Sequence, residues 1–124
     1  MTLYFANMIY QPGSHLIASL KTPDAALIGR AAGFPEWLSQ LIEQYRLRKL
    51  GEVFHDFEPH GFTAVVCLSE SHISIHTWPE HLRINLDIYL SNHERVNDAT
   101  VQALFEKIKA YFQAETITVQ TITR

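Results

Sequence analysis

The sequence contains a single cysteine, Cys67, so no disulfide can form within the chain. A lone cysteine is typical of a reducing compartment, and we expect a cytoplasmic location. No stretch approaches the roughly 18 consecutive apolar residues that suggest a membrane-spanning helix. The net charge of −3 gives no basic surface for nucleic acid. These absences argue against a membrane protein, a disulfide-stapled domain and a nucleic-acid-binding module.

The sequence also shows no linker, internal repeat or low-complexity tract. Residues 1–10 are apolar, but they lack the basic region and the small-residue cleavage site of a signal peptide. We interpret them as an extra strand or arm. With 47% hydrophobic and 19% charged residues, the 124-residue chain is expected to form one globular domain, residues 1–124, with a modest core.

Chemically reactive side chains are concentrated in residues 68–81, which combine histidines, serines, carboxylates and an indole. Groups of this kind are costly to bury without partners, so their density indicates a chemical role. From Ile73 onward, apolar and polar residues alternate, which places Ile73 and Ile75 on one face of a strand and His72 and His76 on the other. One face is predicted to join a core while the other presents reactive groups.

Hydrophobic periodicity and turn signals divide the whole chain into strands and helices. The predicted strands span residues 15–20, 52–57, 62–68, 73–78, 83–91 and 116–123. The predicted helices span residues 24–30, 35–49 and 98–112. The almost continuously apolar segment 62–68 predicts a strand buried on both faces, with Cys67 as a small core residue. Short connections favour antiparallel pairing, so we predict an α+β fold, a two-layer sandwich with helices on one face of a mostly antiparallel sheet.

The histidines leave several interpretations open. A metal site could use imidazole ligands from His55, His60, His72, His76 and His81. Two histidines four residues apart on one strand lie roughly 13 Å apart, too far to share an ion, so we expect no metal site. A serine hydrolase of the common type would need a Gly-x-Ser-x-Gly turn, which is absent. Hydrogen-bonded histidines on a half-exposed sheet remain the simplest alternative.

A further interpretation uses Ser71 against its own backbone. The Ser71 hydroxyl can attack the Glu70 carbonyl, and His76 can then remove the serine α-proton, since imidazole acts as a base near neutral pH. Elimination would free the carboxyl end of Glu70 and leave dehydroalanine, which hydrolyses to a pyruvoyl group. Ser71 and His76 have opposite parity in a flat strand. We therefore expect Ser71 at a kink with a strained peptide bond.

The run Glu70-Ser71-His72-Ile73-Ser74-Ile75-His76-Thr77-Trp78-Pro79-Glu80 resembles the self-cleaving motif of the prokaryotic S-adenosylmethionine decarboxylase proenzymes. The resemblance is ungapped over residues 54–91 and looser outside them. It implies a β chain 1–70, an α chain 71–124 and a self-generated pyruvoyl cofactor. It also implies a homodimer of α/β sandwiches with the active site near the interface, making the aminopropyl donor for spermidine. The substrate amine would form a Schiff base with the pyruvoyl ketone, which accepts the electrons released as carbon dioxide leaves.

Residue roles also follow from the resemblance. Ser71 becomes the pyruvoyl group, Glu70 becomes the new carboxyl end, and His76 is the processing residue. Thr63 stands where the family usually has a serine that assists processing. The family's cysteine proton donor is replaced by Ser91, whose hydroxyl is a much weaker acid than a thiol.

The resemblance also identifies a substrate pocket. Phe57 and Trp78 take the places of an aromatic pair that stacks on adenine, and Glu80 that of a carboxylate that binds the ribose hydroxyls. Ring faces attract both a purine and a sulfonium cation. Core packing for the rings and a solvated turn for Glu80 are the plain alternatives.

Because Ser91 and the changed segment 82–85 depart from the family pattern, three hypotheses stay open. The chain is a decarboxylase of S-adenosylmethionine, a decarboxylase of another amino acid such as arginine or ornithine, or an uncleaved paralogue that binds a ligand or regulates a partner.

Overall fold

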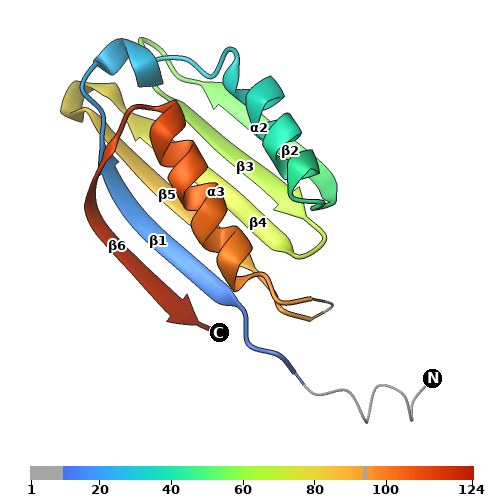
Figure 1. Cartoon of the computed structure of the whole chain (residues 1–124). Coiled ribbons are helices and arrows are strands. Elements are labelled where there is room, and N and C mark those ends of the chain that lie inside the picture. Colours follow the sequence, from blue (N-terminus) through green and yellow to red (C-terminus); the bar gives the residue numbers. More distant parts are fainter. Residues whose placement is uncertain (1–9, 94) are drawn as a thin grey trace.

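The computed structural model describes residues 10–93 and 95–124. The arm predicted at the start of the chain therefore lies almost wholly outside the described residues. Six strands form one sheet in the order β2-β3-β4-β5-β1-β6, and every neighbouring pair is antiparallel (Figure 1). The strands are β1 (Ser14–Lys21), β2 (Lys49–Asp56), β3 (Phe62–Leu68), β4 (Ser71–Trp78), β5 (Arg83–Leu90) and β6 (Glu115–Thr123). The helices are α2 (Phe34–Gln44) and α3 (Asp98–Tyr111), with short 3-10 helices η1 (Ala25–Ile28) and η2 (Pro79–His81).

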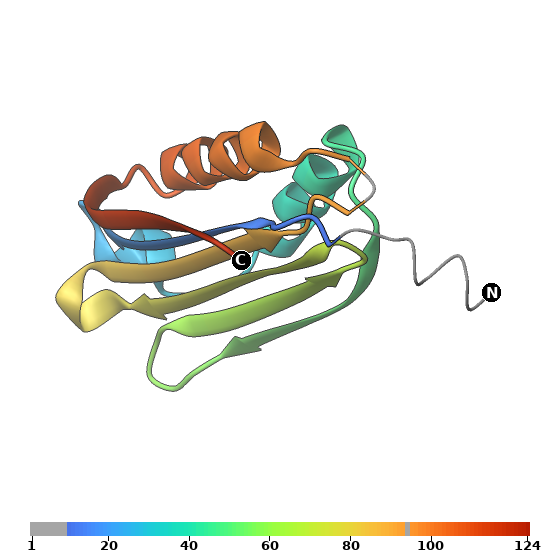
Figure 2. The ribbon, with the colours of Figure 1, turned by 90° about the horizontal axis from the view of Figure 1, so that it is seen from below.

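Both α-helices pack on the same face of the sheet, so the predicted two-layer α+β sandwich is confirmed (Figure 2). The core between the layers is built from alternate strand residues, and Ile84, Leu86 and Ile88 of β5 are completely buried. Burying one such side chain contributes about 1.5–3 kcal/mol. In the described residues, no helix is long and apolar enough to cross a membrane.

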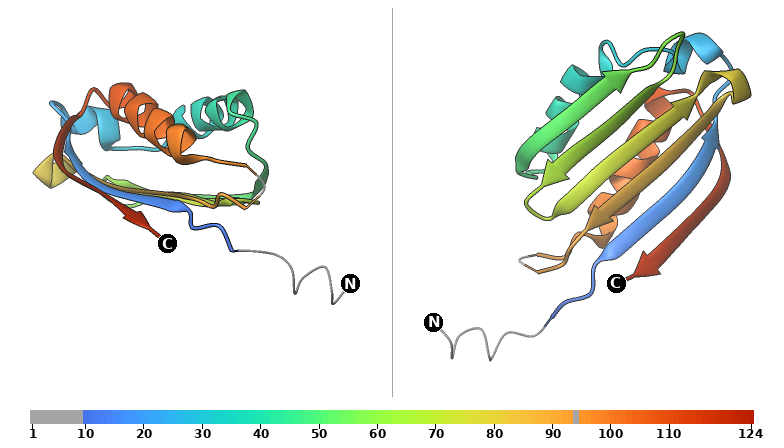
Figure 3. Two further views of the ribbon diagram at one scale, coloured as in Figure 1. Left: turned by 60° about the horizontal axis from the view of Figure 1, so that its bottom comes forward. Right: turned by 180° about the vertical axis from the view of Figure 1, so that it is seen from behind.

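The opposite face of the sheet carries no helix within the described residues (Figure 3). We call it the open face. Its strand residues include His15, Ile17, Ser19, Val53, His55, Thr63, Val65, Cys67, His72, Ser74, His76, Trp78, Asn85, Asp87 and Tyr89. The predicted alternation around Ile73 and Ile75 is confirmed, because both are buried while His72 and His76 lie on the open face.

Two predictions about β3 are wrong. The strand is buried on one face only, because both helices lie on the other side of the sheet. Val65 is 43% exposed, and Cys67 is an exposed thiol rather than a core residue. Continuous apolarity in the sequence therefore does not mean that this chain buries both faces by itself.

The predicted end of the second helix is also wrong. The helix stops at Gln44 instead of continuing to residue 49, where β2 already begins. Arg46 takes a left-handed conformation with φ of 57°. The Leu47 N–H donates to the Ile42 carbonyl at 3.0 Å, and the Arg46 N–H donates to the Glu43 carbonyl at 2.9 Å. This is a Schellman ending, which stops a helix without glycine.

The first predicted helix is confirmed only as the short 3-10 helix η1. The Asp24 side chain accepts a hydrogen bond from the Ala26 N–H at 2.9 Å and so caps it. The long final helix α3 and its buried stripe are confirmed.

Candidate active site

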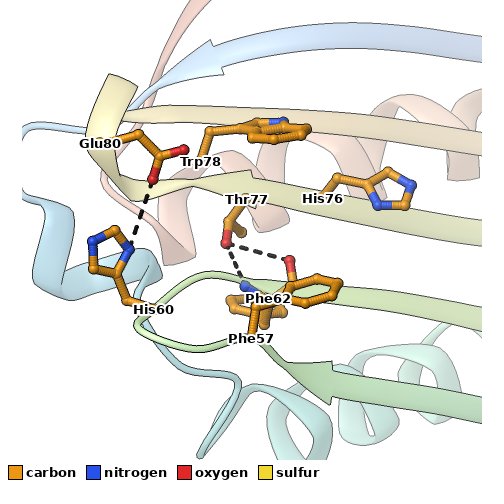
Figure 4. Close-up of a pocket in the computed structure, with 7 residues that line it drawn as sticks. All are labelled: Phe57, His60, Phe62, His76, Thr77, Trp78 and Glu80. Carbon is orange, nitrogen blue, oxygen red and sulfur yellow. Dashed lines mark hydrogen bonds and ion pairs between the residues drawn. The ribbon is translucent and has the colours of Figure 1, made fainter.

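A pocket of about 330 Å³ lies at one end of the open face, where β4 runs into η2 (Figure 4). Its lining consists of Phe57, His60, Phe62, His76, Thr77, Trp78 and Glu80. The structure therefore brings together all three residues expected to bind substrate, although Phe57 comes from the β2–β3 turn. The processing residue His76 lies in the same wall.

Two aromatic side chains of this pocket, Phe57 and Trp78, are unusually exposed, whereas Phe62 is buried. Phe57 is 47% exposed and Trp78 is 48% exposed, so neither is the core residue that the plain alternative required. The Trp78 Nε1–H donates to Asn85 Oδ1 at 2.8 Å, and Asn85 in turn donates to the Ser19 hydroxyl at 3.2 Å. These bonds fix the orientation of the indole. This contact between Asn85 and Trp78 was not predicted. The alternation of β5 does place Asn85 on the open face with Trp78, which would have made it a candidate partner.

The turn that carries Phe57 is held by hydrogen bonds. The Phe57 N–H donates to the Gly61 carbonyl at 2.8 Å, and the Arg30 guanidinium donates to the Phe57 carbonyl at 2.8 Å. Gly61 has φ of 98°, which favours glycine because a Cβ atom is disfavoured there. A Cβ on Gly61 would also lie 3.2 Å from the Pro79 ring. The β2–β3 turn and η2 are thus fitted against each other, which sets the position of Phe57.

Thr77 anchors the pocket floor. Its buried hydroxyl donates to the Ile28 carbonyl at 2.9 Å and accepts from the Phe62 N–H at 2.8 Å. The hydroxyl thereby connects β4, β3 and η1 beneath the pocket. Thr77 was missed as a site residue because its partners are 15 and 49 residues away.

Polar contacts orient the remaining pocket groups. Thr63 Oγ1 and His76 Nδ1 are 2.5 Å apart, so the two expected processing residues are direct neighbours. Glu80 Oε2 lies 3.7 Å from His60 Nδ1, which brings positive charge to the carboxylate when the imidazole is protonated. Among residues 10–93 and 95–124, no group of three or more histidine, cysteine or carboxylate side chains is arranged to hold a metal ion.

The expected cleavage site lies at the other end of β4. Ser71 has φ of 137°, a strained conformation for a residue other than glycine, and this confirms the predicted kink. The Glu70 carbonyl accepts a hydrogen bond from the Ser91 N–H at 2.7 Å. Such a donor polarises the carbonyl and stabilises the oxyanion that forms when a nucleophile attacks it. Ser91 therefore contacts, through its backbone N–H, the peptide bond at which cleavage is expected.

The structure does not bring Ser71 and His76 of one chain together. They are five positions apart in β4, and a strand rises about 3.3 Å per residue, which gives roughly 16 Å. The groups expected to act in cleavage are therefore divided between two places along β4. Glu70, Ser71 and Ser91 are at one place. Thr63, His76 and the substrate pocket are at the other.

A cluster of charged and aromatic side chains lies beside the cleavage site on the open face. Its members are His15, His72, Asp87, Tyr89 and Arg124. Arg124 donates to His15 Nδ1 at 3.2 Å, so the His15 proton is on Nε2, which lies 3.3 Å from the Asp87 carboxylate. Burial is the main cause that lowers the pKa of His72. This cluster was not predicted from the sequence, because its histidines, Asp87 and Tyr89 come together only when β1, β4 and β5 pair.

Comparisons with known proteins agree with this geometry. Residues 14–124 match the family model described as S-adenosylmethionine decarboxylase. The chain belongs to the S-adenosylmethionine decarboxylase family. The resemblance of the 70–80 run is thereby confirmed and extends to most of the sequence.

Relatives in this decarboxylase family come from archaea and bacteria. The chain is 35% identical over 97 residues to an S-adenosylmethionine decarboxylase proenzyme of Archaeoglobus fulgidus, covering 78% of this chain and 87% of that protein. It is 44% identical over 77 residues to the proenzyme of Aquifex aeolicus, covering 62% of this chain and 57% of that protein. A crystal structure of the adenosylmethionine decarboxylase from Aquifex aeolicus superposes with a TM-score of 0.75 at 29% identity, covering 94% and 91% of the two chains.

Proposed function

We propose that this chain is a self-cleaving, pyruvoyl-dependent decarboxylase of S-adenosylmethionine, and that it supplies the aminopropyl donor for spermidine. Family membership supports the reaction class. The observation that carries the proposal is the strained Ser71 peptide, whose Glu70 carbonyl is held by the Ser91 N–H at 2.7 Å. A surface histidine cluster without catalytic function would need neither feature.

Cleavage proceeds between Glu70 and Ser71. The Ser71 hydroxyl oxygen adds to the Glu70 carbonyl carbon while the Ser91 N–H stabilises the oxyanion, and breakage of the C–N bond leaves an ester and a free amine. Removal of the Ser71 α-proton expels the Glu70 carboxylate and leaves dehydroalanine. The dehydroalanine, an enamine, tautomerises to an imine, and water then replaces the imine nitrogen, which leaves as ammonia. This yields residues 1–70 as the β chain and 71–124 as the α chain.

The residues around Ser71 suit a pyruvoyl group, because the strained peptide and its oxyanion donor favour the cleavage that forms it. Once formed, the group supplies an electron sink for loss of carbon dioxide. Ser91 lies next to this position and is the candidate proton donor, in place of the family's cysteine. His76, supported by the Thr63 hydroxyl, is the base of processing.

The pocket residues suit a sulfonium nucleoside. Phe57 and Trp78 offer exposed ring faces to adenine and to the positive sulfur. Glu80 offers carboxylate oxygens to the ribose hydroxyls, and charged acceptors make strong hydrogen bonds. The pocket volume of about 330 Å³ is in the range of small-ligand sites.

We propose a homodimer in which two copies pack through their open faces. The face exposes apolar side chains, among them Val53 at 65% and Val65 at 43%, as an interface would require. In a two-fold interface the same surface is used by both copies. If the β4 strands run in opposite directions across it, Ser71 of one copy faces the His76 pocket of the other. This arrangement resolves the separation of about 16 Å within one chain.

We also keep the cytoplasm as the expected location, since a free, exposed Cys67 suits a reducing compartment.

Intact-mass analysis of freshly purified protein tests the proposal. We expect two fragments, residues 1–70 and 71–124, and a carbonyl on the second fragment that hydroxylamine traps. Ser71→Ala should stay whole. Purified protein should then release labelled carbon dioxide from S-adenosylmethionine. Release only from arginine or ornithine would reject the substrate, and an uncleaved chain with an ordinary serine at 71 would reject the whole proposal.

A further inference from the structure

A second pocket lies directly behind the cleavage turn and has no part in the proposed substrate site. It measures about 450 Å³ and is lined by Arg46, Arg48, Ser69, Glu70 and Arg95. These residues come from the α2–β2 loop, the β3–β4 turn and the β5–α3 loop. Two distant loops thus place guanidinium groups around Glu70, the residue whose carbonyl is attacked in the proposed cleavage.

Arg95 makes the central contacts of this pocket. Its guanidinium donates to the Arg46 carbonyl at 2.7 Å and to the Tyr45 carbonyl at 3.3 Å. It also lies 3.3 Å from Glu70 Oε2, and the Glu70 side chain is only 10% exposed. The Ser69 N–H donates to the Arg48 carbonyl at 2.9 Å, which ties the same turn to the same loop.

These contacts bear on the strain at Ser71. A strained residue persists only when its surroundings hold it there. The neighbouring Glu70 is held twice, at its carbonyl by the Ser91 N–H and at its side chain by Arg95. Releasing the side chain would let the turn relax and would weaken the alignment of the carbonyl with its oxyanion donor.

The charge of the pocket bears on what happens after cleavage. Among the described residues that line this pocket there are three arginines, Arg46, Arg48 and Arg95, and one carboxylate, Glu70, so their charges sum to an excess of positive charge in the uncleaved chain. Self-cleavage creates a second carboxylate on this same residue, the new α-carboxylate of Glu70. Arginine binds carboxylates through paired, charge-assisted hydrogen bonds, so the pocket matches the group that the reaction produces.

We propose that Arg95, Arg46 and Arg48 form a carboxylate clamp on Glu70. Before cleavage, Arg95 is a positioning residue that holds the acyl side of the scissile bond through the Glu70 side chain. After cleavage, the clamp also takes the new α-carboxylate and keeps the end of the β chain in place. The inference rests on the proposed self-cleavage and adds residues outside the 70–80 run to it.

The test follows the rate of cleavage during cell-free synthesis of the full chain, by intact mass. We expect Arg95→Ala to slow cleavage at least tenfold. Arg95→Lys should slow it less, because lysine keeps the positive charge but lacks the paired N–H donors of the guanidinium group. Glu70→Gln preserves shape and should slow cleavage similarly. The double variant Arg95→Ala/Glu70→Gln should be no slower than the slower single variant, because each change breaks the same contact.

Two controls separate the clamp from general damage. Lys109→Ala removes a surface ion pair with Glu106 on α3 and should cleave at the wild-type rate. Each clamp variant is also made with Ser71→Ala, and its melting temperature shows whether the uncleaved chain still folds. Glu70→Gln and Arg95→Lys keep the test decisive if Arg95→Ala fails to fold.

Retention of the β chain gives the second readout. Native mass spectrometry of cleaved Arg46→Ala and Arg48→Ala should show more free β chain than wild type. Equal cleavage rates and equal retention would overturn the clamp while leaving the proposed function intact. Additive effects of Arg95→Ala and Glu70→Gln would overturn it too. A wild-type chain that stays whole would overturn both proposals together.

Discussion

Mixing two inactive variants tests whether each active site is built from two copies of the chain. Ser71→Ala keeps the Thr63 and His76 pair but has no hydroxyl for the attack. His76→Ala keeps the strained Ser71 peptide but has no base. The two positions are roughly 16 Å apart along β4, whereas proton transfer needs heavy atoms within about 3 Å. A single chain therefore cannot use its own His76 on its own Ser71 without a large rearrangement.

The assay coexpresses the two variants in equal amounts with tags of different mass. Random pairing places about half of the His76→Ala chains in mixed dimers, and each mixed dimer contains one intact Ser71 facing one intact His76. We expect about half of the His76→Ala chains to be cleaved and none of the Ser71→Ala chains. Each variant expressed alone should remain whole.

A matched control replaces Ser71→Ala with the double variant Ser71→Ala/His76→Ala, which pairs equally well but supplies no base. This mixture should show no cleavage. The reasoning is refuted if mixed dimers are isolated through their two tags and remain uncleaved. It is also refuted if His76→Ala cleaves by itself at the wild-type rate.

Three smaller changes test other parts of the structure. Thr77→Val leaves two buried backbone groups without their hydrogen-bond partner at about 1–3 kcal/mol each, so urea unfolding should show a loss of roughly 2–6 kcal/mol. The exposed Thr118→Val should change stability by less than about 0.5 kcal/mol. Ser91→Cys restores a stronger acid and should raise turnover or reduce mistaken transamination of the cofactor; no effect on either would remove the Ser91 side chain from the mechanism. The lowered pKa of His72 means that below its ordinary value of 6.5 the unfolded chain binds a proton that the folded chain resists. Stability should therefore fall as the pH drops through 6.5, and His72→Gln should flatten this part of the melting-temperature profile.

Most of the fold was predictable because its signals are local. Alternation in β4 and β5 gave the buried face, and turn residues gave the hairpins. The end of α2 was not predictable from propensity, since Arg46 and Leu47 stop it through a Schellman ending rather than through glycine. Helix-favouring arginines after Gln44 extended the prediction into β2.

The candidate site was predictable only where its residues are close in sequence. The 70–80 run contains the proposed nucleophile, the proposed base and four of the seven residues that line the pocket. Arg95, Asn85 and Arg30 act on these groups from other strands and loops, and nothing in their local sequence marks them. The separation of Ser71 from His76 was hidden for a different reason. A gap of five residues is one and a half turns in a helix but roughly 16 Å in a strand.

The wrong prediction about β3 and the divided site lead to the same surface. The apolar pattern of residues 62–68 indicates burial on both faces, yet the chain alone covers only one, leaving Val65 and Cys67 exposed. The proposed cleavage chemistry needs His76 beside Ser71, yet the two residues of one chain lie roughly 16 Å apart along β4. In the proposed dimer, a second copy packed on the open face buries Val65 and Cys67. It also brings His76 of one copy beside Ser71 of the other. One arrangement thus accounts for a packing signal and a chemical requirement that were read from different residues.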